Sequence, residues 1–233
     1  MPLRLDELAK TIDLTLPSPR SSPKAVAKLC EQAGELHVAS VCVLPQHVAA
    51  AAELTHGGDV KVAVIVGFPL GSEPLAKKMA EAEAAVGEGA DEIEIVLNVQ
   101  AMLEADFRLA CDELLAIARA ARTKGANMKG AWPLVKVVVE TSQLDEKRTR
   151  LACKIAEEVE ADFVQTSSGF GADGTTVFDV ELLREWLPDQ LAVKASGRIG
   201  TIADLYAMLN AGAGRIGTPA AAKLTASFAN DAL

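Results

Sequence analysis

The sequence predicts a single α/β domain over residues 1–233, a (β/α)8 TIM barrel preceded by a short N-terminal helical segment. Short apolar runs rich in β-branched residues alternate with amphipathic segments from one end of the chain to the other. Strands that alternate with helices in this rhythm form βα units and a parallel sheet. Eight such runs in 233 residues favour closure of the sheet into a barrel over an open sheet.

The expected strands are short, and several are nearly continuous apolar runs, which is typical of parallel strands covered on both faces. One run contains the segment Val-Lys-Val-Val-Val at residues 135–139. In chain order, the eight strands are expected at residues 12–15, 38–43, 60–67, 92–97, 134–141, 163–167, 191–196 and 215–218.

Helices are expected between these strands because apolar residues recur there every three or four positions. Ser22 followed by Pro23 is typical of an N-cap and a first helical turn, and Thr201 with Asp204 has capping-box spacing. Residues 123–133 form the longest expected loop. The helical periodicity is carried by Leu75, Met79, Ala82 and Val86, by Leu103, Phe107, Ala110, Leu114 and Ala118, and by Leu151, Ile155 and Val159.

The composition indicates what fills the core and which partners are excluded. Half of the residues are hydrophobic but only 4% are aromatic, so we expect layers of branched aliphatic side chains inside the barrel. The formal net charge of −9 argues against a nucleic-acid partner, which would require a basic face. No segment has the length and apolar character of a membrane span, and the N-terminal residues have no signal-peptide pattern. We therefore expect a cytoplasmic protein without a membrane partner.

The cysteines and histidines show no spacing that indicates a metal site. Cys30, Cys42, Cys111 and Cys153 include no CxxC pair, so we expect free thiols in a reducing compartment. The three histidines, at positions 37, 47 and 56, lack the HExxH-type spacing of zinc ligands. No metal is expected.

Motifs at the expected carboxyl ends of the strands follow one another in a family-specific order. They are Ile-Asp-Leu-Thr-Leu (12–16), Val-Cys-Val (41–43), Gly-Phe-Pro-Leu-Gly (67–71), Gly-Ala-Asp-Glu-Ile (89–93), Val-Lys-Val (135–137), Thr-Ser-Ser-Gly-Phe (166–170), Val-Lys-Ala-Ser-Gly (193–197) and Gly-Arg-Ile-Gly-Thr (214–218). By these motifs the chain resembles the deoxyribose-phosphate aldolase family over residues 12–218.

The resemblance implies an enzyme that cleaves 2-deoxyribose 5-phosphate to acetaldehyde and glyceraldehyde 3-phosphate, without a metal or another cofactor. In that family a lysine at the end of the sixth strand forms a Schiff base. A second lysine on the seventh strand lowers the pKa of the first, and a carboxylate on the fourth strand relays protons. An iminium withdraws electrons from the adjacent carbon, which is why the nucleophilic amine must be neutral. The resemblance also implies a homo-oligomer.

The sequence departs from this pattern at the positions that carry the chemistry. The sixth-strand motif has Gln165 at the place of the Schiff-base lysine, and an amide cannot form an imine. The seventh-strand lysine is present as Lys194, and Glu94 replaces the fourth-strand aspartate. Glutamate keeps the acid–base chemistry but moves the carboxyl group by about one methylene.

The expected phosphate end departs as well. The family's Ser-Gly-Gly-Ile-Arg corresponds to Ser-Gly-Arg-Ile-Gly at residues 196–200. Arg198 adds a charge but crowds the backbone amides, which a glycine would leave open to an anion. Pro219 has no N–H to offer there. Departures at several positions together indicate natural divergence or extensive redesign rather than a single inactivating substitution, and we favour a divergent paralogue. The positions are Glu94, Gln165, Arg198, Gly200 and Pro219.

Three residues are the candidate catalytic groups, and each has a structural alternative. Lys194 is interpreted as a relocated Schiff-base amine, as a cation that polarises a carbonyl or holds an anion, or as an ion-pair partner of Glu94. Glu94 is a general acid–base or a charge partner of Lys194 or Lys136. Gln165 either hydrogen-bonds a carbonyl or enolate or fills the space of the lysine with polar atoms.

A second set of residues is expected to bind substrate. Lys136 lies inside a strand and requires a partner there, either Glu94 or Glu140. Asp13 and Thr15 are substrate-hydroxyl binders or capping groups at the strand end, and Cys42 lines the pocket rather than acting as a nucleophile. The full set is Asp13, Thr15, Cys42, Lys136, Thr166, Ser168, Gly169, Gly197, Arg198, Gly217 and Thr218.

The leading functional hypothesis is an aldolase-like lyase that acts on a small carbonyl or sugar-type substrate by aldol, retro-aldol or related enolate chemistry, without the family's usual lysine. Two alternatives stay open. One is an active deoxyribose-phosphate aldolase whose imine has moved to Lys194. The other is a non-catalytic paralogue that binds a metabolite or a protein partner.

Overall fold

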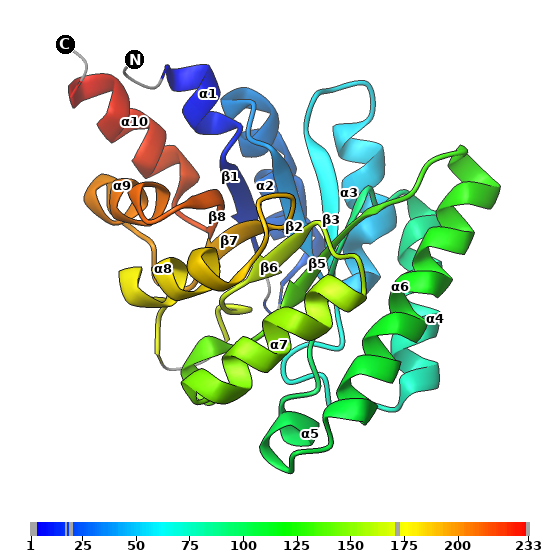
Figure 1. Cartoon of the computed structure of the whole chain (residues 1–233). Coiled ribbons are helices and arrows are strands. Elements are labelled where there is room, and N and C mark those ends of the chain that lie inside the picture. Colours follow the sequence, from blue (N-terminus) through cyan, green and yellow to red (C-terminus); the bar gives the residue numbers. More distant parts are fainter. Residues whose placement is uncertain (1–3, 17, 19–20, 171–172, 232–233) are drawn as a thin grey trace.

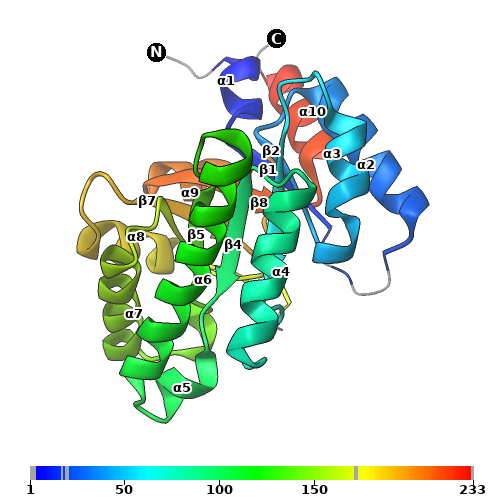
Figure 2. The same ribbon diagram turned by 90° about the vertical axis from the view of Figure 1, so that its right-hand side faces the viewer.

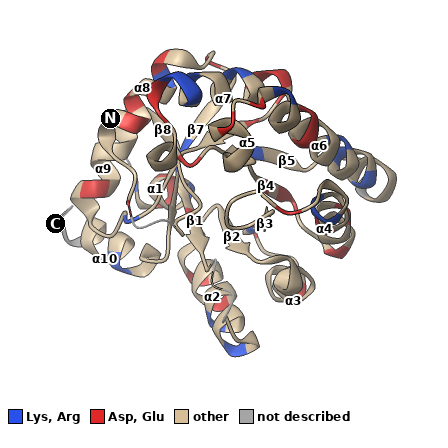
Figure 3. Ribbon diagram, turned by 90° about the horizontal axis from the view of Figure 1, so that it is seen from below, with Lys and Arg blue, Asp and Glu red and all other residues tan. Residues whose placement is uncertain are grey.

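The computed structural model describes residues 4–16, 18, 21–170 and 173–231, and its centre is a closed barrel of eight strands. Each strand pairs in parallel with the next, and β8 closes the barrel against β1. Helices surround the strands on all sides (Figures 1 and 3). The predicted (β/α)8 barrel is therefore confirmed.

The eight strands lie where the apolar runs predict them, although six are shorter than expected. Strands β4, β5 and β6 end earlier than expected, β2 and β7 begin later, β3 is shorter at both ends, and β8 begins two residues earlier, at Ala213. The strands are β1 (Ile12–Thr15), β2 (Ser40–Val43), β3 (Lys61–Val66), β4 (Glu92–Val96), β5 (Leu134–Val138), β6 (Phe163–Gln165), β7 (Ala192–Ser196) and β8 (Ala213–Thr218).

The helices include the expected N-terminal segment, α1, which packs beside α10 (Figure 2). They are α1 (Leu5–Ala9), α2 (Pro23–Leu36), α3 (Val48–Thr55), α4 (Leu75–Glu88), α5 (Val99–Leu103), α6 (Phe107–Lys129), α7 (Glu146–Glu158), α8 (Val177–Trp186), α9 (Ile202–Asn210) and α10 (Ala221–Asp231), with 3₁₀ turns η1 (Pro45–His47) and η2 (Thr141–Gln143). No helix in these described ranges has the length and apolar character needed to cross a membrane.

The predicted helix signals at Ser22 and Thr201 are confirmed. The Ser22 side chain accepts a hydrogen bond from the Ala25 N–H, with Pro23 in the first turn. Thr201 and Asp204 form a reciprocal capping box at the start of α9. These side chains satisfy backbone N–H groups that have no partner within the helix.

Two predictions around α6 are wrong. The expected loop at residues 123–133 is helical as far as Lys129. A side chain at Gly125 would lie 2.7 Å from the Ala131 carbonyl oxygen, so this glycine permits close packing rather than marking a loop. Leu103 does not share a helix with Phe107, because Asp106 caps a new helix there and accepts a hydrogen bond from the Leu109 N–H at 3.1 Å.

Although Ile65, Val96 and Val138 lie inside the barrel, most of the branched aliphatic residues of the strands lie on the opposite side from the one predicted. They face outward and pack against the helices in the main hydrophobic core. Because side chains alternate along a strand, the intervening positions point into the barrel, and many of them are polar or charged. A small apolar cluster inside the barrel comprises Cys42, Leu44, Ala63, Ile65, Val96 and Val138. The barrel interior is thus partly polar, which is where chemistry requires it.

Candidate active site

The strand register brings the three candidate catalytic residues toward the barrel interior. Gln165 on β6 lies directly opposite Lys194 on β7, and Glu94 on β4 lies opposite Lys136 on β5. Directly paired residues of parallel strands point to the same side of the sheet. Lys194 and Glu94 contact each other inside the barrel, so the Gln165 side chain also points inward.

A buried cluster of six charged side chains occupies this interior, and Asp13 is at its centre. The Asp13 Oδ2 atom lies 2.7 Å from the Lys136 Nζ atom and 2.9 Å from the Lys194 Nζ atom. Its Oδ1 atom accepts hydrogen bonds from Ser40 Oγ, at 2.8 Å, and from Arg215. Asp13 is 0% exposed, and in this structure its side chain contacts Lys136, Lys194, Arg215 and Ser40 rather than the cavity at the mouth.

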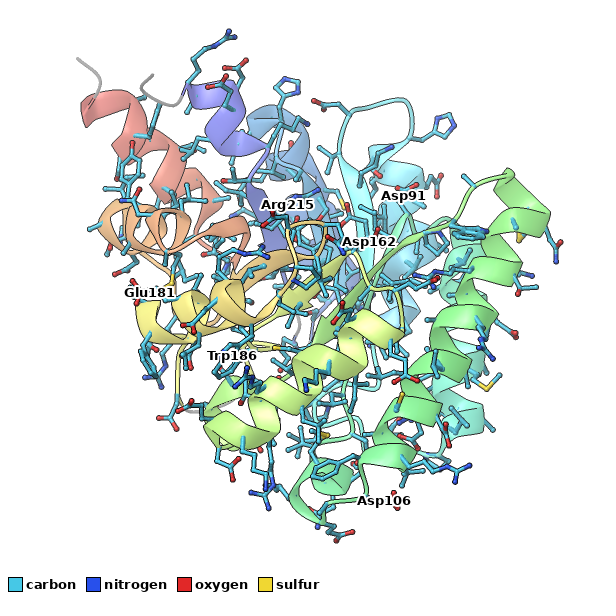
Figure 4. All side chains as sticks on the ribbon, in the orientation of Figure 1. Asp91, Asp106, Asp162, Glu181, Trp186 and Arg215 are labelled. Atoms are coloured by element: carbon cyan, nitrogen blue, oxygen red, sulfur yellow. The ribbon has the colours of Figure 1, made fainter. Side chains whose placement is uncertain are left out.

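Lys136 and Arg215 complete the cluster with Glu92 and Glu94. The Lys136 Nζ atom lies 2.6 Å from Glu92 Oε2 and 3.4 Å from Glu94 Oε1. Arg215 NH2 lies 3.5 Å from Glu92 Oε1. Figure 4 places Arg215 among the strands, on the side where Asp91 and Asp162 precede β4 and β6. The cluster therefore begins in the amino-terminal half of the barrel.

Lys194 pairs with Glu94 as well as with Asp13, and it is fully buried. Burial disfavours its charged form, but the attraction of Asp13 and Glu94 is stronger and raises the Lys194 pKa. Burial likewise opposes the charged carboxylate of Glu94, yet Lys194 and Lys136 lower its pKa. Lys194 is thus an ammonium ion and Glu94 a carboxylate. In this structure the two side chains form an ion pair with each other, as one of the sequence interpretations expected.

Gln165 is the one candidate whose hydrogen bonding is incomplete. Its Nε2 atom donates to the Ser167 carbonyl oxygen at 2.8 Å. Its Oε1 atom is buried and finds no hydrogen-bond partner in the described part of the chain, and the residue is 1% exposed. The amide is held at one end and unpaired at the other.

A cavity of about 450 Å³ lies at the carboxyl ends of β1, β6, β7 and β8. Six of the predicted substrate-binding residues line it: Thr15, Ser168, Gly169, Gly197, Arg198 and Gly217. The other five, Asp13, Cys42, Lys136, Thr166 and Thr218, do not. A larger cavity of about 870 Å³ lies beside α1 and α2, and none of the candidate residues lines it.

Several predicted residues serve the structure rather than the cavity. The Thr166 Oγ1 atom donates to the Ser196 carbonyl oxygen and accepts from the Ser196 N–H, which joins β6 to β7. Thr218 makes the same kind of bonds to Ile199 and Ala220. Burial, followed by the charge of Glu94, raises the pKa of the Cys42 thiol well above its usual value. Cys42 thus carries a protonated thiol in the small apolar cluster inside the barrel, outside the lining of the mouth cavity.

Arg198 is the exposed cation of the cavity wall. Its backbone is left-handed, with φ of 59°, and no ion-pair partner for it lies among residues 4–16, 18, 21–170 and 173–231. Gly174 makes room for it, since a side chain there would come within 2.8 Å of the Arg198 Cβ atom. The guanidinium is thus available to an anion at the mouth.

Glu140 holds the loop after β6 and was not predicted to do so. Its Oε1 atom accepts from the Ser168 N–H at 2.7 Å, and its Oε2 atom accepts from Ser167 Oγ at 3.2 Å. The prediction that Lys136 pairs with Glu140 is therefore wrong, although the alternative partner, Glu94, is correct. Glu140 is buried and left-handed, with φ of 53°.

Two aromatic rings from the loops that follow β3 and β6 contact each other. Phe68 follows β3 and packs on the small apolar cluster, and Phe170 follows β6 and is 56% exposed. Their ring centroids are 5.2 Å apart in an edge-to-face arrangement. Strands β3 and β6 are separated by β4 and β5, so this contact bridges loops of non-adjacent strands.

Sequence reasoning missed Glu92 and Arg215 as members of the charged cluster, and Ser40 as a hydrogen-bond donor to Asp13 within it. The signal was present as period-two spacing, because Glu92 and Glu94 must point to the same side of β4.

Among the described residues, no group of three or more His, Cys, Asp or Glu side chains is arranged so that it could hold a metal ion.

Comparison with known proteins agrees with this architecture. Residues 8–210 match the model of the DeoC/LacD family aldolases. A deoxyribose-phosphate aldolase of Caldanaerobacter subterraneus is 39% identical over 229 residues, which cover 98% of this chain and 96% of the relative. The solved aldolase QR15 superimposes with a TM-score of 0.88 at 34% identity, covering 97% of both chains.

The Aeropyrum pernix deoxyribose phosphate aldolase, described as a tetramer, has a TM-score of 0.86 at 31% identity and covers 97% of this chain and 92% of its own. The sequence motifs, the closed barrel and these similarities agree over nearly the whole chain. The chain belongs to the DeoC/LacD family of aldolases.

Proposed function

We propose that this chain is an aldolase-type lyase for a small carbonyl or sugar-type substrate, and that it works without a Schiff base at position 165. The observation that carries the proposal is the buried Lys194–Glu94 ion pair in a barrel interior shared with Gln165. The proposal is supported by the resemblance of residues 163–167 to the family's sixth-strand motif, in which Gln165 corresponds to the Schiff-base lysine. Catalysis must then use the charged groups that remain.

These groups fit a non-covalent retro-aldol reaction. Ionised Glu94 removes the proton from the substrate hydroxyl, the carbon–carbon bond breaks, and its electron pair passes to the carbonyl oxygen as an enolate. The Lys194 ammonium stabilises that negative charge by a hydrogen bond. Glu94, now protonated, returns its proton to the enolate carbon, so both carbonyl products leave neutral and the enzyme is regenerated.

The raised pKa of Lys194 disfavours the alternative in which the imine has moved to this residue. A nucleophilic amine must first lose its proton. Deprotonation of Lys194 would leave the negative charges of Asp13 and Glu94 with less positive charge nearby. In the family, the seventh-strand lysine lowers the pKa of the Schiff-base lysine. Here the seventh-strand lysine is Lys194, and position 165 holds a glutamine, which has no amine whose pKa could be lowered.

The cavity at the mouth supports an anionic substrate group held by Arg198 and the glycine-rich loops. We propose no metal or other cofactor. The tetramer described for the Aeropyrum pernix relative supports a homo-oligomeric state for this chain as well.

A binding protein without catalysis is the second candidate, and one observation favours it. Lys194, Glu94 and Gln165 are each at most 1% exposed, and none lines the mouth cavity. A substrate must therefore displace the loops above these residues before it reaches them.

One experiment separates the three possibilities. The protein is incubated with acetaldehyde and borohydride, its intact mass and peptides are measured, and aldehyde release from 2-deoxyribose 5-phosphate and other aldols is assayed in parallel. We expect no adduct on Lys194 and turnover that is lost in Glu94→Gln. An adduct on Lys194 alone would establish the relocated imine, and the absence of turnover with every aldol would leave the binding protein.

A further inference from the structure

The unpaired amide oxygen of Gln165 marks a place where a hydrogen-bond donor is missing. The residue is 1% exposed and its Oε1 atom has no hydrogen-bond partner in the described ranges. Nearly all buried polar atoms in folded proteins are paired, and leaving one unpaired destabilises the fold. A residue that only filled space would destabilise the fold in this way without any benefit. The unpaired Gln165 oxygen therefore points to a binding role.

The orientation of the amide is fixed by its other end. Nε2 donates to the Ser167 carbonyl oxygen at 2.8 Å. Turning the amide by 180° would bring Oε1 against that carbonyl, so two acceptors would face each other. The free end is therefore the oxygen, which accepts hydrogen bonds and cannot donate them.

The neighbours of Gln165 in the sheet do not supply the missing donor. On one side lies Val138, a member of the apolar cluster. On the other lies Lys194, whose ammonium group has three N–H donors. Two of these are directed to Asp13 and Glu94. An unpaired acceptor and an ammonium with one further donor thus lie on adjacent strands, both inside the barrel.

We infer that Gln165 is a substrate-binding residue that accepts a hydrogen bond from a hydroxyl group, while Lys194 donates to the carbonyl oxygen of the same molecule. The ligand class is a small hydroxy-carbonyl compound, that is, an aldol. This inference rests on the proposed function, which requires the same class of substrate, but it concerns the bound complex before reaction. The hydroxyl donates its hydrogen bond to the Gln165 oxygen on binding, and cleavage requires that the same hydroxyl turn to Glu94, because it has only one proton. A simple aldehyde or ketone would leave the Gln165 oxygen unpaired.

A matched pair of ketones tests the inference. 4-Hydroxy-2-butanone and 2-pentanone have the same heavy-atom skeleton, with a hydroxyl in one and a methyl in the other. Each is titrated into the whole protein and followed by two-dimensional amide NMR. We expect the wild type to favour the hydroxy-ketone, and Gln165→Met, which has nearly the same volume and no strong acceptor, to lower the ratio of the two affinities about tenfold, equivalent to about 1.4 kcal/mol.

Gln100→Met is the control, because Gln100 is exposed and pairs only with Glu104 on α5 and the turn after it. It should leave the affinity ratio unchanged. Equal affinity ratios in the wild type and Gln165→Met would overturn the inference. A wild type that shows no preference for the hydroxy-ketone would overturn it too, and this second result does not depend on the folding of a variant. Occupation of Oε1 by water alone predicts that same lack of preference.

The same samples distinguish a failure of this inference from a failure of the proposed function. One-dimensional spectra report any cleavage of the hydroxy-ketone to acetone and formaldehyde, and the aldehyde assay reports turnover of other aldols. A hydroxyl preference without turnover would retain the binding role of Gln165 and reject the lyase. Turnover without a hydroxyl preference would retain the lyase and reject the binding role.

Discussion

At the scale of single residues, Lys194 and Gln165 differ in how completely they are paired. Lys194 has its charge opposed by Asp13 and Glu94, whereas Gln165 has one half of its amide bonded and the other half free. The first arrangement fixes the protonation state of an amine. The second leaves room for a ligand atom. A single substitution can therefore change the chemistry at position 165 without removing an existing ion pair.

We expect Gln165→Lys to acquire an imine-forming amine. Its Cα position lies opposite Lys194, and both burial and a like charge nearby lower the pKa of a lysine. Incubation with acetaldehyde and borohydride should give a reduced adduct on residue 165, detected by peptide mass. Gln165→Met is the matched control and should give none. If the lysine variant folds and remains unlabelled, the assignment of position 165 to the family's Schiff-base site is wrong.

At the scale of elements, the strands were predictable and their inward faces only partly so. Apolar runs locate all eight strands because both faces of a parallel sheet are covered. Partner choice inside the barrel depends on register between strands far apart in sequence, such as Asp13 with Lys136 and Arg215. Local pattern holds no such information. The loop that was wrongly predicted at the end of α6 has a related cause. Gly125 lies inside the helix, and it is a glycine because the backbone at residue 131 packs closely against it.

Glu140 links two of these elements, and its replacement should loosen the loop after β6. Glu140→Gln converts a charged acceptor of the Ser168 N–H into a neutral one. Hydrogen bonds to charged groups contribute about 1.5–3 kcal/mol and neutral ones about 1 kcal/mol, so hydrogen exchange at the Ser168 amide should accelerate about twofold to thirtyfold. Glu157→Gln, at an exposed position of α7, should leave that rate unchanged. An unaltered Ser168 rate in Glu140→Gln would show that other contacts hold the loop.

At the scale of the whole molecule, the buried cluster couples stability to pH at the two extremes. The lysines lower the pKa values of Asp13 and Glu94 from 3.8 and 4.5, and the carboxylates raise that of Lys194 from 10.5. The carboxylate contribution is complete above their unfolded values and is lost as pH falls through the folded ones. The lysine contribution is complete below 10.5 and is lost as pH rises through the folded pKa.

We therefore expect the stability difference between wild type and Glu94→Gln to be constant from about pH 5.5 to about pH 9.5. It should shrink only under more acidic or more alkaline conditions. Urea unfolding across pH 3 to 11, in steps of about one unit, measures it. If the difference in the free energy of unfolding changed with pH near neutrality, Glu94 or Lys194 would not be held in the charged state.

The contact between Phe68 and Phe170 has a consequence for how the loops move. An edge-to-face aromatic pair contributes only about 0.5–1.5 kcal/mol beyond its buried area, so it is a weak link between the loops that follow β3 and β6. These two strands are not neighbours in the barrel. The rings therefore couple the motions of two loops that the sheet itself does not join.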